Sequence, residues 1–537
     1  MTERREFTLV LLAGALLTLA LTYPLAFNLG GIGRVDNGDG QFSIWNVAWV
    51  ARALVTDPVH VFDANIFYPD LGTLAYSENN LGAGAVAIPV YWATRNPYAA
   101  HNFAVLVSFM ASFIGMYYLV RHLTGDRRAA AISGIAFGFC PYMFAHTAQI
   151  HLLMIGGLPV VMLALHRFVD TPTMGRGAAL GATMAIQALF CGYYGIFAIL
   201  LVGYGVVVIF TIRRLWSRRS VWIALATGAI LAMAIVLPEC LPYVRVQRAG
   251  FGRTLEAAAS FSATWSSFLA SPMRAHVWML RSLSPWSEAV FPGFLVTLLG
   301  VAGAWLSRRD RRGELLWLYG GLAVLACWAS FGPSAKLYSV LYHSVPLFSW
   351  MRAPNRFGAI VIFSLCVLTG IAVARLAKGK HGNAIAWVFA AIAISESLVD
   401  WPMRPVEPLE PVYRVLRTLP SGPVIEMPFF YLDFMFPRHA YYMLQSTSHW
   451  MPIVNGYSDY MPPDFLEHAK VLPAFPSRDS LKVLEQSHVR YAIFHRYWYT
   501  DETWATVAPR MNEFKRYLRP MFSDDGTQLY EIAGFPP

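Results

Sequence analysis

The stretch FTLVLLAGALLTLALTYPLAF, residues 7–27, decides the fold of this chain. It follows a short basic start and is about 20 residues long, enough for a helix to cross a hydrocarbon core of ~30 Å. Because it does not end in an A-x-A cleavage pattern, we interpret it as an uncleaved membrane span and not as a signal peptide. Of the 537 residues, 56% are hydrophobic and 14% are charged, against about 25% charged in soluble domains. The composition therefore predicts an integral membrane protein.

The basic residues gather in short clusters between the apolar stretches. The clusters lie at 4–5, 121–128, 167–176, 213–219, 307–314 and 375–382. Cytoplasmic loops of membrane proteins collect Lys and Arg, so these clusters predict one common, cytoplasmic side. The net charge of +10 then reflects topology, and we expect no nucleic-acid partner, because the charge forms no single stripe or tail.

Two crossings fit between successive clusters, which predicts about 11 transmembrane helices with the N-terminus inside and the C-terminus outside. The expected spans are 7–27, 101–120, 129–146, 150–166, 177–192, 194–212, 220–238, 291–306, 315–331, 357–374 and 383–400. The apolar stretch 81–95 is too short to cross and is expected to be interfacial or re-entrant. Residues 1–400 therefore form a transmembrane domain with a long first external loop, 28–100.

From about residue 401 the composition changes. A Pro-rich linker is followed by GPVIEMPFF, HVRYAIFHRYW and QLYEIAG, which are typical of short strands. PDFLEHAKVLPAF, SRDSLKVLEQS and DETWATVAPRMNEFKRYL between them carry helical spacing of apolar residues. Residues 401–537 are thus expected to form a small extracytoplasmic α/β domain, which makes the fold class an α-helical polytopic membrane protein with a C-terminal α/β domain.

The first external loop begins with VDNGDGQFSIWNVAWV, residues 35–50. Phe42, Trp45 and Trp49 share one face of an expected helix at 42–54, which we interpret as lying flat on the membrane, since Trp favours the headgroup level. Two interpretations of the preceding acids stay open. Asp39 can simply cap this helix, with Asp36 in an ordinary turn. Alternatively, a carboxylate beside Trp rings has a raised pKa and serves as a general base for an acceptor hydroxyl.

Several segments carry a resemblance to known proteins. They are DANIFYPDLGTLAYSENNLG (63–82), FGFCPYMFAHTAQIHLL (137–153), EAVFPG (288–293), MRAPNRF (351–357) and STSHWMPIVNGYSDY (446–460). With the acidic first loop, they make the chain similar to a bacterial group of multi-span proteins that resembles the GT-C superfamily of glycosyltransferases. Enzymes of that superfamily take sugars from polyprenyl-phosphate donors at the outer membrane face. The resemblance covers nearly the whole chain.

The resemblance implies a catalytic Asp in the first external loop. The matching position is Asp39, with Asp36 second, and Glu78 and Asp70 are further candidates in the same loop. The loop has no adjacent Asp-Glu or D-x-D pair, so the sequence assigns no metal ligand. Dependence on a divalent cation such as Mg²⁺ or Mn²⁺ stays open.

Cations and polar groups on the predicted outer face fit a departing lipid phosphate. Arg352 and Arg356 precede a span, and their planar forks suit phosphate, although the same residues can anchor a span end by snorkelling. Arg245 is a weaker candidate of the same kind. The polar residues His146, Gln149 and His151 lie where one span ends and the next begins, and they either line a cavity or bind the donor. The five-residue separation of the two His does not predict a zinc site.

The C-terminal domain gathers His449, Trp450, Asn455 and Tyr457. Aromatic and amide groups suit acceptor sugar recognition, but they equally suit docking of a small domain on the membrane-embedded body, and docking is the preferred interpretation.

The expected function is transfer of a hexosyl or pentosyl group from a polyprenyl-phosphate donor to an extracytoplasmic acceptor, with inversion, at a bacterial plasma (inner) membrane. The partners are the lipid-linked sugar, membrane lipid, and a glycan, lipid or protein acceptor. A transporter or flippase of lipid-linked saccharide, or a non-catalytic cell-envelope assembly protein, is the alternative. Charges collect on one face and the spans are poor in polar groups, which favours surface chemistry over passage across the bilayer.

Overall fold

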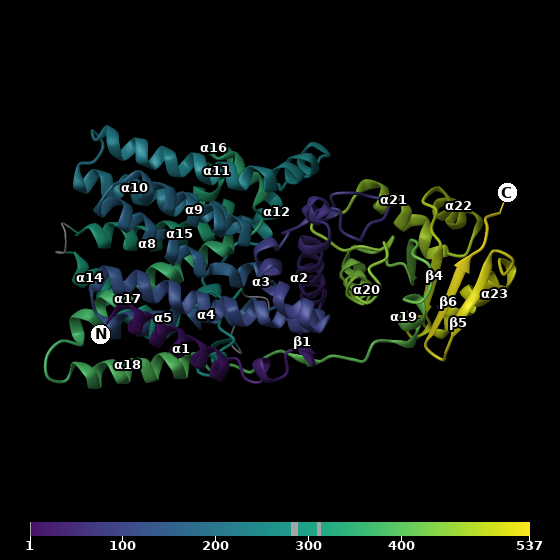
Figure 1. Ribbon diagram of the computed structural model, residues 1–537, viewed down its shortest axis with the longest axis horizontal. Helices are drawn as coiled ribbons and strands as arrows, with labels where there is room; N and C mark the ends of the chain where they lie inside the picture. Colours follow the sequence, from purple (N-terminus) through teal and green to yellow (C-terminus); the bar gives the residue numbers. More distant parts are fainter. Residues whose placement is uncertain (1, 281–287, 309–312, 537) are drawn as a thin grey trace. The chain divides into compact units, whose positions relative to one another are not determined.

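The computed structural model describes residues 2–280, 288–308 and 313–536 (Figure 1). The chain divides into two compact units. Unit 1 comprises Met1–Asn28 and Phe103–Pro402, and unit 2 comprises Leu29–Asn102 and Met403–Pro537. The sequence analysis assigned residues 28–100 to the transmembrane domain, whereas the structure groups Leu29–Asn102 with the C-terminal segment. Unit 2 is therefore assembled from two segments that lie far apart in the sequence.

Unit 1 is built from helices that run alongside one another (Figure 1). The longer ones are α1 (Glu3–Leu21), α4 (Pro97–Thr124), α5 (Arg127–Gly138), α8 (Gly157–Asp170), α9 (Met174–Phe190), α10 (Gly192–Arg213), α11 (Arg219–Arg248), α14 (Phe294–Ser307), α15 (Gly321–Ser330), α17 (Gly358–Leu376) and α18 (Gly382–Glu396). Shorter ones are α6 (Pro141–Ala145), α7 (Ile150–Leu153), α12 (Leu255–Ser260), α13 (Val277–Leu280) and α16 (Leu337–Ser344).

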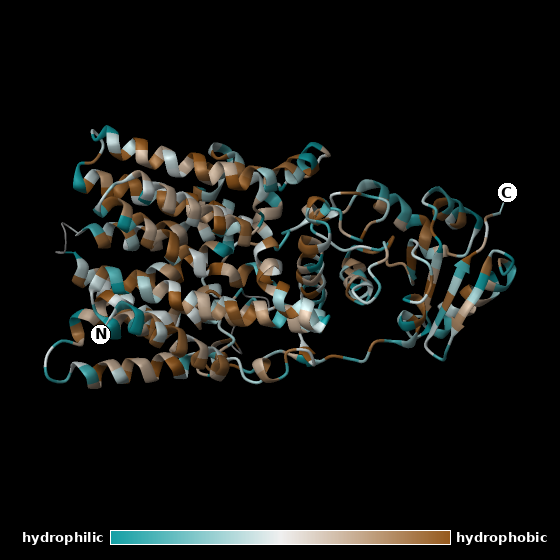
Figure 2. Ribbon diagram, in the orientation of Figure 1, coloured by the Kyte–Doolittle hydropathy of each residue, from teal (hydrophilic) through white to brown (hydrophobic). Residues whose placement is uncertain are grey.

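Helical segments occupy all the stretches in which spans are expected. Among the described residues, 6 helices are long and apolar enough to cross a membrane. They are Pro97–Thr124, Arg127–Ala145, Ile150–Asp170, Gly192–Arg213, Arg219–Arg248 and Pro354–Leu376. Figure 2 shows apolar residues along most of the length of these helices. The other expected crossings correspond to shorter or less apolar helices, so the eleven-span topology stays a prediction.

The basic clusters expected on one side of the membrane meet at one end of unit 1. Glu6 accepts hydrogen bonds from Arg121 Nε (2.9 Å) and Arg127 Nε (2.8 Å). Further on, Arg213 binds Asp170 at 2.8 Å and Glu314 at 2.7 Å. These ion pairs connect four of the predicted cytoplasmic clusters and the N-terminal helix. Loops that the Lys and Arg pattern assigned to a common side therefore do lie together.

Small residues let α9 and α11 approach each other closely. A Cβ atom built on Gly177 would overlap the backbone of Ala224, and one built on Gly181 would overlap the backbone of Gly228. Such small-residue contacts are a common way to pack helices in membranes, where burial of apolar side chains from lipid contributes little.

Unit 2 contains a four-stranded sheet in the order β3-β4-β6-β5. Its strands are β3 (Val424–Met427), β4 (Tyr491–His495), β5 (Leu518–Ser523) and β6 (Thr527–Ile532). β3 and β4 are parallel, and the other pairs are antiparallel. The strands expected in GPVIEMPFF, HVRYAIFHRYW and QLYEIAG are confirmed. β5 was missed because its Pro520 argues against a strand, but β5 lies at the sheet edge, where proline is tolerated.

Unit 2 also contains seven α-helices among its described residues. They are α2 (Gly38–Thr56), α3 (Leu81–Thr94), α19 (Pro411–Leu416), α20 (His439–Ser446), α21 (Pro463–Val471), α22 (Arg478–Gln486) and α23 (Asp501–Glu513). A two-stranded sheet of β1 (Ile32–Gly33) and β2 (Arg404–Pro405) joins the two segments of the unit. The three helices predicted after residue 460 are confirmed as α21, α22 and α23.

The interfacial interpretation of the α2 tryptophans is wrong. Trp45 is fully buried and Trp49 is 7% exposed. Their indole N–H groups donate to Asn65 Oδ1 (3.1 Å) and to the Val61 carbonyl (2.9 Å). The helical periodicity identified an apolar face correctly, but protein covers that face and lipid headgroups do not. Trp49 also packs on Trp450, with ring centres 5.7 Å apart.

Candidate functional site

Asp39 lies in the first turn of α2. Asn37 caps this helix, because its side-chain oxygen accepts a hydrogen bond from the Gly40 N–H at 2.8 Å. The alternative in which Asp39 itself is the N-cap is therefore wrong. Gly40 packs so closely on the backbone of Arg34 that a Cβ atom would overlap it, which fixes where the helix begins. A carboxylate at a helix N-terminus is favoured by the helix dipole.

The second segment of unit 2 supplies a partner for Asp39. The hydroxyl of Tyr457 donates to Asp39 Oδ1 at 3.0 Å. The Tyr457 ring packs edge-on against Phe42, with centres 6.1 Å apart. Asp39 is half-buried. We call Asp39 and Tyr457 the Asp39 site.

Asp36 has a different environment. Its carboxylate pairs with the Arg34 guanidinium, with Nε and Oδ1 2.9 Å apart. Arg34 is largely buried, whereas Asp36 is an exposed residue. The Arg34 guanidinium offsets the charge of Asp36.

Two further candidates of the C-terminal segment, Trp450 and Asn455, have different kinds of contact. Trp450 donates to the Tyr91 hydroxyl at 3.1 Å and lies under the guanidinium of Arg52, so it contacts the first segment, as Tyr457 does. Asn455 is buried and exchanges two hydrogen bonds with the Glu426 backbone, at 2.8 and 2.9 Å. It fastens a loop to strand β3.

Two other candidates, His449 and Glu78, contact other residues of unit 2. His449 is stacked on Tyr413, with ring centres 6.1 Å apart, and its Nδ1 accepts from the Met451 N–H. Burial lowers the pKa of His449 to about 3, so this imidazole is neutral at physiological pH. Glu78 lies just before α3, and Asn46 of α2 donates to its backbone carbonyl at 3.1 Å.

In unit 1, Tyr193 brings Arg352 and Arg356 together. The Arg352 N–H donates to the Tyr193 hydroxyl at 3.0 Å. The Arg356 guanidinium carbon lies 4.1 Å from the centre of the same ring. Arg356 belongs to a 3₁₀ turn, Pro354–Phe357, that leads into α17, and Arg352 precedes it in extended chain. Stacking on an aromatic face orients a guanidinium and leaves its donors in the ring plane.

His146 and Glu288 extend this group. His146 Nε2 lies 3.4 Å from Glu288 Oε2. Hydrogen bonding to His146 lowers the pKa of Glu288 against the effect of burial, and the charge of Arg356 acts in the same direction. His151 is close enough to both arginines to interact with them electrostatically. We call Arg352, Arg356, His146, His151, Glu288 and Tyr193 the arginine cluster.

Two further candidates have other positions in unit 1. Gln149 precedes the short helix α7, whose second residue is His151. Arg245 lies near the C-terminal end of α11, where it is exposed.

No group of three or more His, Cys, Asp or Glu side chains that could hold a metal ion occurs among the described residues. Near Asp39, the second acid is already paired with Arg34. The residues present do not fit a metal site built from protein ligands alone, so we assign no chemical step to a divalent cation.

Sequence reasoning missed Tyr193 and Glu288, although EAVFPG marked the segment that contains Glu288. It also missed a buried acid and histidine in unit 2, Glu426 and His495, which are 2.7 Å apart. An available signal was the presence of ionisable residues inside two apolar strand sequences, because such residues are rarely buried without a partner.

The comparisons with known proteins concern the fold. Neither the family models nor the curated proteins give a match. Among solved structures, the arabinofuranosyltransferase AftD from Mycobacteria matches with a TM-score of 0.59 at 12% identity, over 99% of this chain. The chain spans 40% of the length of AftD. ArnT from Cupriavidus metallidurans, solved in the apo state and bound to undecaprenyl phosphate, gives TM-scores of 0.42 and 0.41 at 14% identity, with full coverage of both chains. The likeness to AftD shows a shared fold.

Proposed function

We propose that this protein is a membrane glycosyltransferase that moves a sugar from a polyprenyl-phosphate donor to an extracytoplasmic hydroxyl acceptor. The observation that carries the proposal is the likeness in fold to an arabinofuranosyltransferase along 99% of this chain. The Asp39 site and the arginine cluster add side chains suited to such a transfer. Asp39, Arg352 and Arg356 were candidates from the sequence, whereas Tyr193 and Glu288 were not.

We assign the role of general base to Asp39. The acceptor oxygen attacks the anomeric carbon of the sugar on the face opposite the phosphate, and its proton passes to the Asp39 carboxylate. The bond between the anomeric carbon and the phosphate oxygen breaks, its electron pair stays on that oxygen, and polyprenyl phosphate leaves. The product has inverted configuration. Tyr457 acts as a positioning residue, because its hydroxyl holds one carboxylate oxygen of Asp39.

We assign binding of the donor phosphate to the arginine cluster. Negative charge grows on the phosphate as the sugar leaves, and positioned cations stabilise that charge without reorganising. Tyr193 holds the Arg352 backbone through its hydroxyl and stacks on the Arg356 guanidinium through its ring. The Arg352 guanidinium lies over the Phe261 ring, 4.8 Å from its centre. Glu288 limits the net positive charge of the cluster, and His146 pairs with it.

The proposal places the protein in a bacterial plasma membrane, with unit 2 on the outer side. It keeps the N-terminus on the cytoplasmic side, where the basic clusters of unit 1 gather. Membrane lipid and a polyprenyl-linked sugar are then its partners, and the acceptor carries a reactive hydroxyl.

The test uses the purified full-length protein in detergent, incubated with radiolabelled polyprenyl-phosphate sugars and an envelope extract as acceptor. Release of free polyprenyl phosphate together with label in the extract is the expected result. Asp39→Asn should lower the rate of this transfer by at least ~10²-fold, in line with the contribution of a general base.

The matched control is Asp57→Asn. Asp57 is an exposed carboxylate at the end of α2, where it pairs with His60, and its loss should leave transfer unchanged. Wild-type turnover by Asp39→Asn would remove Asp39 from the mechanism. Binding of the donor with no release of lipid phosphate would refute transfer and favour transport.

A further inference from the structure

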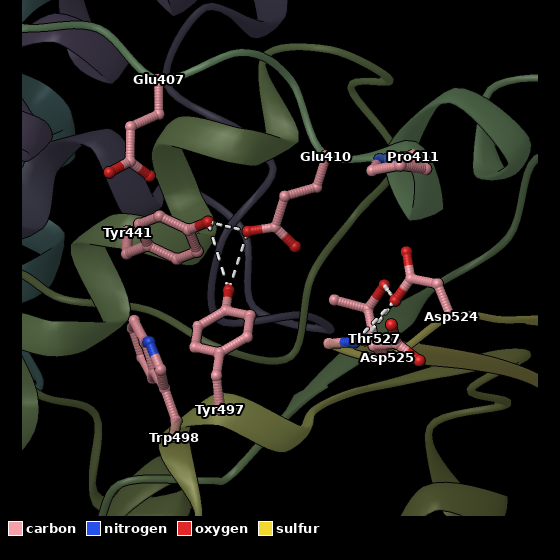
Figure 3. A pocket seen from close by; sticks show the side chains of 10 residues that line it. Glu407, Glu410, Pro411, Tyr441, Tyr497, Trp498, Asp524, Asp525 and Thr527 are labelled. Atoms are coloured by element: carbon pink, nitrogen blue, oxygen red, sulfur yellow. Dashed lines mark hydrogen bonds between the residues drawn. The ribbon is translucent and has the colours of Figure 1, made fainter.

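A cavity in unit 2 lies apart from the residues assigned to transfer. Its volume is about 580 Å³. It is lined by Glu407, Glu410, Pro411, Tyr441, Tyr497, Trp498, Asp524, Asp525, Gly526 and Thr527. Figure 3 shows the aromatic side chains and the acids around one opening. Ligand pockets of small molecules commonly measure roughly 300–1,000 Å³.

The aromatic wall of the cavity is held in place by Glu410. Tyr441 and Tyr497 both donate to its Oε1, the second at 2.7 Å (Figure 3). Trp498 packs beside Tyr441, with ring centres 5.1 Å apart and planes inclined by 47°. The three rings therefore form a fixed apolar surface with a carboxylate at its edge.

A buried ion pair supports this arrangement from behind. His495 and Glu426 are both fully buried, with Nε2 and Oε2 2.7 Å apart. The other ring nitrogen of His495 lies 3.6 Å from Glu410 Oε2 and 3.0 Å from the Tyr497 hydroxyl. Burial alone would lower the pKa of His495, but the two carboxylates outweigh it and raise the pKa to about 9. Glu410 is thus anchored by a charged imidazole.

The far side of the cavity is a tight turn between β5 and β6. Asp524 Oδ1 accepts hydrogen bonds from the Gly526 and Thr527 N–H groups at 2.9 and 2.6 Å. Asp525, next to it, is exposed at the opening. These hydrogen bonds hold the turn in place, so this wall of the cavity forms without a ligand.

The chemistry of the lining limits the ligand. Four of the ten lining residues are acids, Glu407, Glu410, Asp524 and Asp525, and none is Lys or Arg. The negative charge of these acids disfavours binding of an anionic ligand in the cavity. Carboxylates and tyrosine hydroxyls accept hydrogen bonds from hydroxyl groups, and aromatic faces pack on the C–H face of a sugar ring. We propose that this cavity binds a saccharide unit that carries no acidic group. The binding is independent of the proposed transfer reaction and needs no donor lipid.

The experiment measures binding to the full-length protein in detergent by saturation-transfer NMR. The probes are the methyl glycosides of glucose, mannose, galactose and arabinose, with methyl glucuronide as the acidic counterpart. At least one neutral glycoside should receive saturation, and the glucuronide should not. Failure of all four neutral probes, or equal binding of the glucuronide, would overturn the proposal.

Three variants locate the binding. Trp498→Ala should weaken it about 10-fold, because the largest ring of the aromatic wall is removed. Tyr497→Phe keeps the ring but removes one of the two tyrosine hydrogen bonds to Glu410, and it should also weaken binding. Trp265→Ala, which removes a tryptophan that is 73% exposed in unit 1, is the matched control and should bind as wild type does.

Wild-type binding by both cavity variants contradicts the proposal. Tyr497→Phe still decides the question if Trp498→Ala fails to fold. No donor is present, so this result is separate from the transfer assay.

Discussion

The hydroxyl of Tyr457 donates a hydrogen bond of 3.0 Å to Asp39, although the two residues are 418 positions apart in the chain. The bond links the two segments of unit 2 at the acid proposed as general base. It gives Tyr457 a role that its own sequence context does not reveal.

Tyr457→Phe should lower kcat for sugar transfer by about 10-fold, which corresponds to about 1.4 kcal/mol of transition-state stabilisation. The reason is that Asp39 loses the donor that orients it, while the tyrosine ring and its packing on Phe42 remain. KM for the donor should change little. A steady-state measurement of both constants checks this, and an unchanged kcat would show that the bond does not position Asp39.

Arg356→Ala should reduce affinity for the polyprenyl phosphate product by about 10-fold or more, because a charge-assisted contact to phosphate is lost. Arg356→Lys should recover little of it, because the ammonium group cannot reproduce the planar stack on Tyr193. The measurement is product inhibition by polyprenyl phosphate.

Arg274→Ala is the control for that series, since Arg274 is an exposed arginine of unit 1 paired with Asp400. It should behave as the wild type does. Equal loss of affinity in Arg274→Ala and Arg356→Ala would mean that the effect reflects overall charge and not the arginine cluster.

The buried pair of His495 and Glu426 should make the stability of unit 2 depend on pH. The pKa of His495 is raised from 6.5 to about 9 in the folded state. Its contribution to stability is therefore complete below about pH 6.5 and is lost as the pH rises through 9. Thermal unfolding followed by tryptophan fluorescence should show a fall of the midpoint across this window.

His495→Gln should remove that pH dependence and destabilise unit 2 by about 3 kcal/mol at pH 7, because it leaves Glu426 buried without its charged partner. The double variant His495→Gln, Glu426→Gln should be less destabilised than the single one. A wild-type midpoint that stays flat between pH 6.5 and 9 would contradict this account.

Asp70 should give unit 2 a second pH-dependent contribution to stability. Partial burial, together with the neighbouring Asp464 carboxylate, raises its pKa from 3.8 to about 6. The protonated form is favoured in the folded state, so the contribution of Asp70 to stability is complete below about pH 4 and is lost as the pH rises through 6. Asp70→Asn should therefore raise the unfolding midpoint at pH 8 by about 2 °C and change it little at pH 4. A lower midpoint at pH 8 would show that the ionised acid is needed.

Much of the local structure could be predicted from the residues. The apolar stretches and the basic clusters between them predicted helices that are all present, and the ionic contacts of Glu6, Arg121 and Arg213 bring those clusters together. In the C-terminal segment, runs of branched and aromatic residues predicted three strands, and helical spacing of apolar residues predicted three helices. These signals are local, because side-chain periodicity follows directly from backbone geometry.

The candidate site was predictable only in part. The residue types of Arg352 and Arg356 suggested phosphate binding. Nothing in the sequence identified Tyr193, which lies 159 residues before Arg352. Glu288 was likewise missed as the partner of His146. Such contacts depend on which helix ends meet, and residue patterns within one segment do not contain that information.

By itself, the sequence determined the membrane character of the chain, the helical stretches and the faces of those helices that are apolar. Only the tertiary structure decided what covers each face. Trp45 and Trp49 show the difference: their spacing defined an apolar face, and packing within unit 2, not lipid, buries it. Apolar surface is favoured equally by any environment that excludes water, so periodicity specifies burial without specifying the partner.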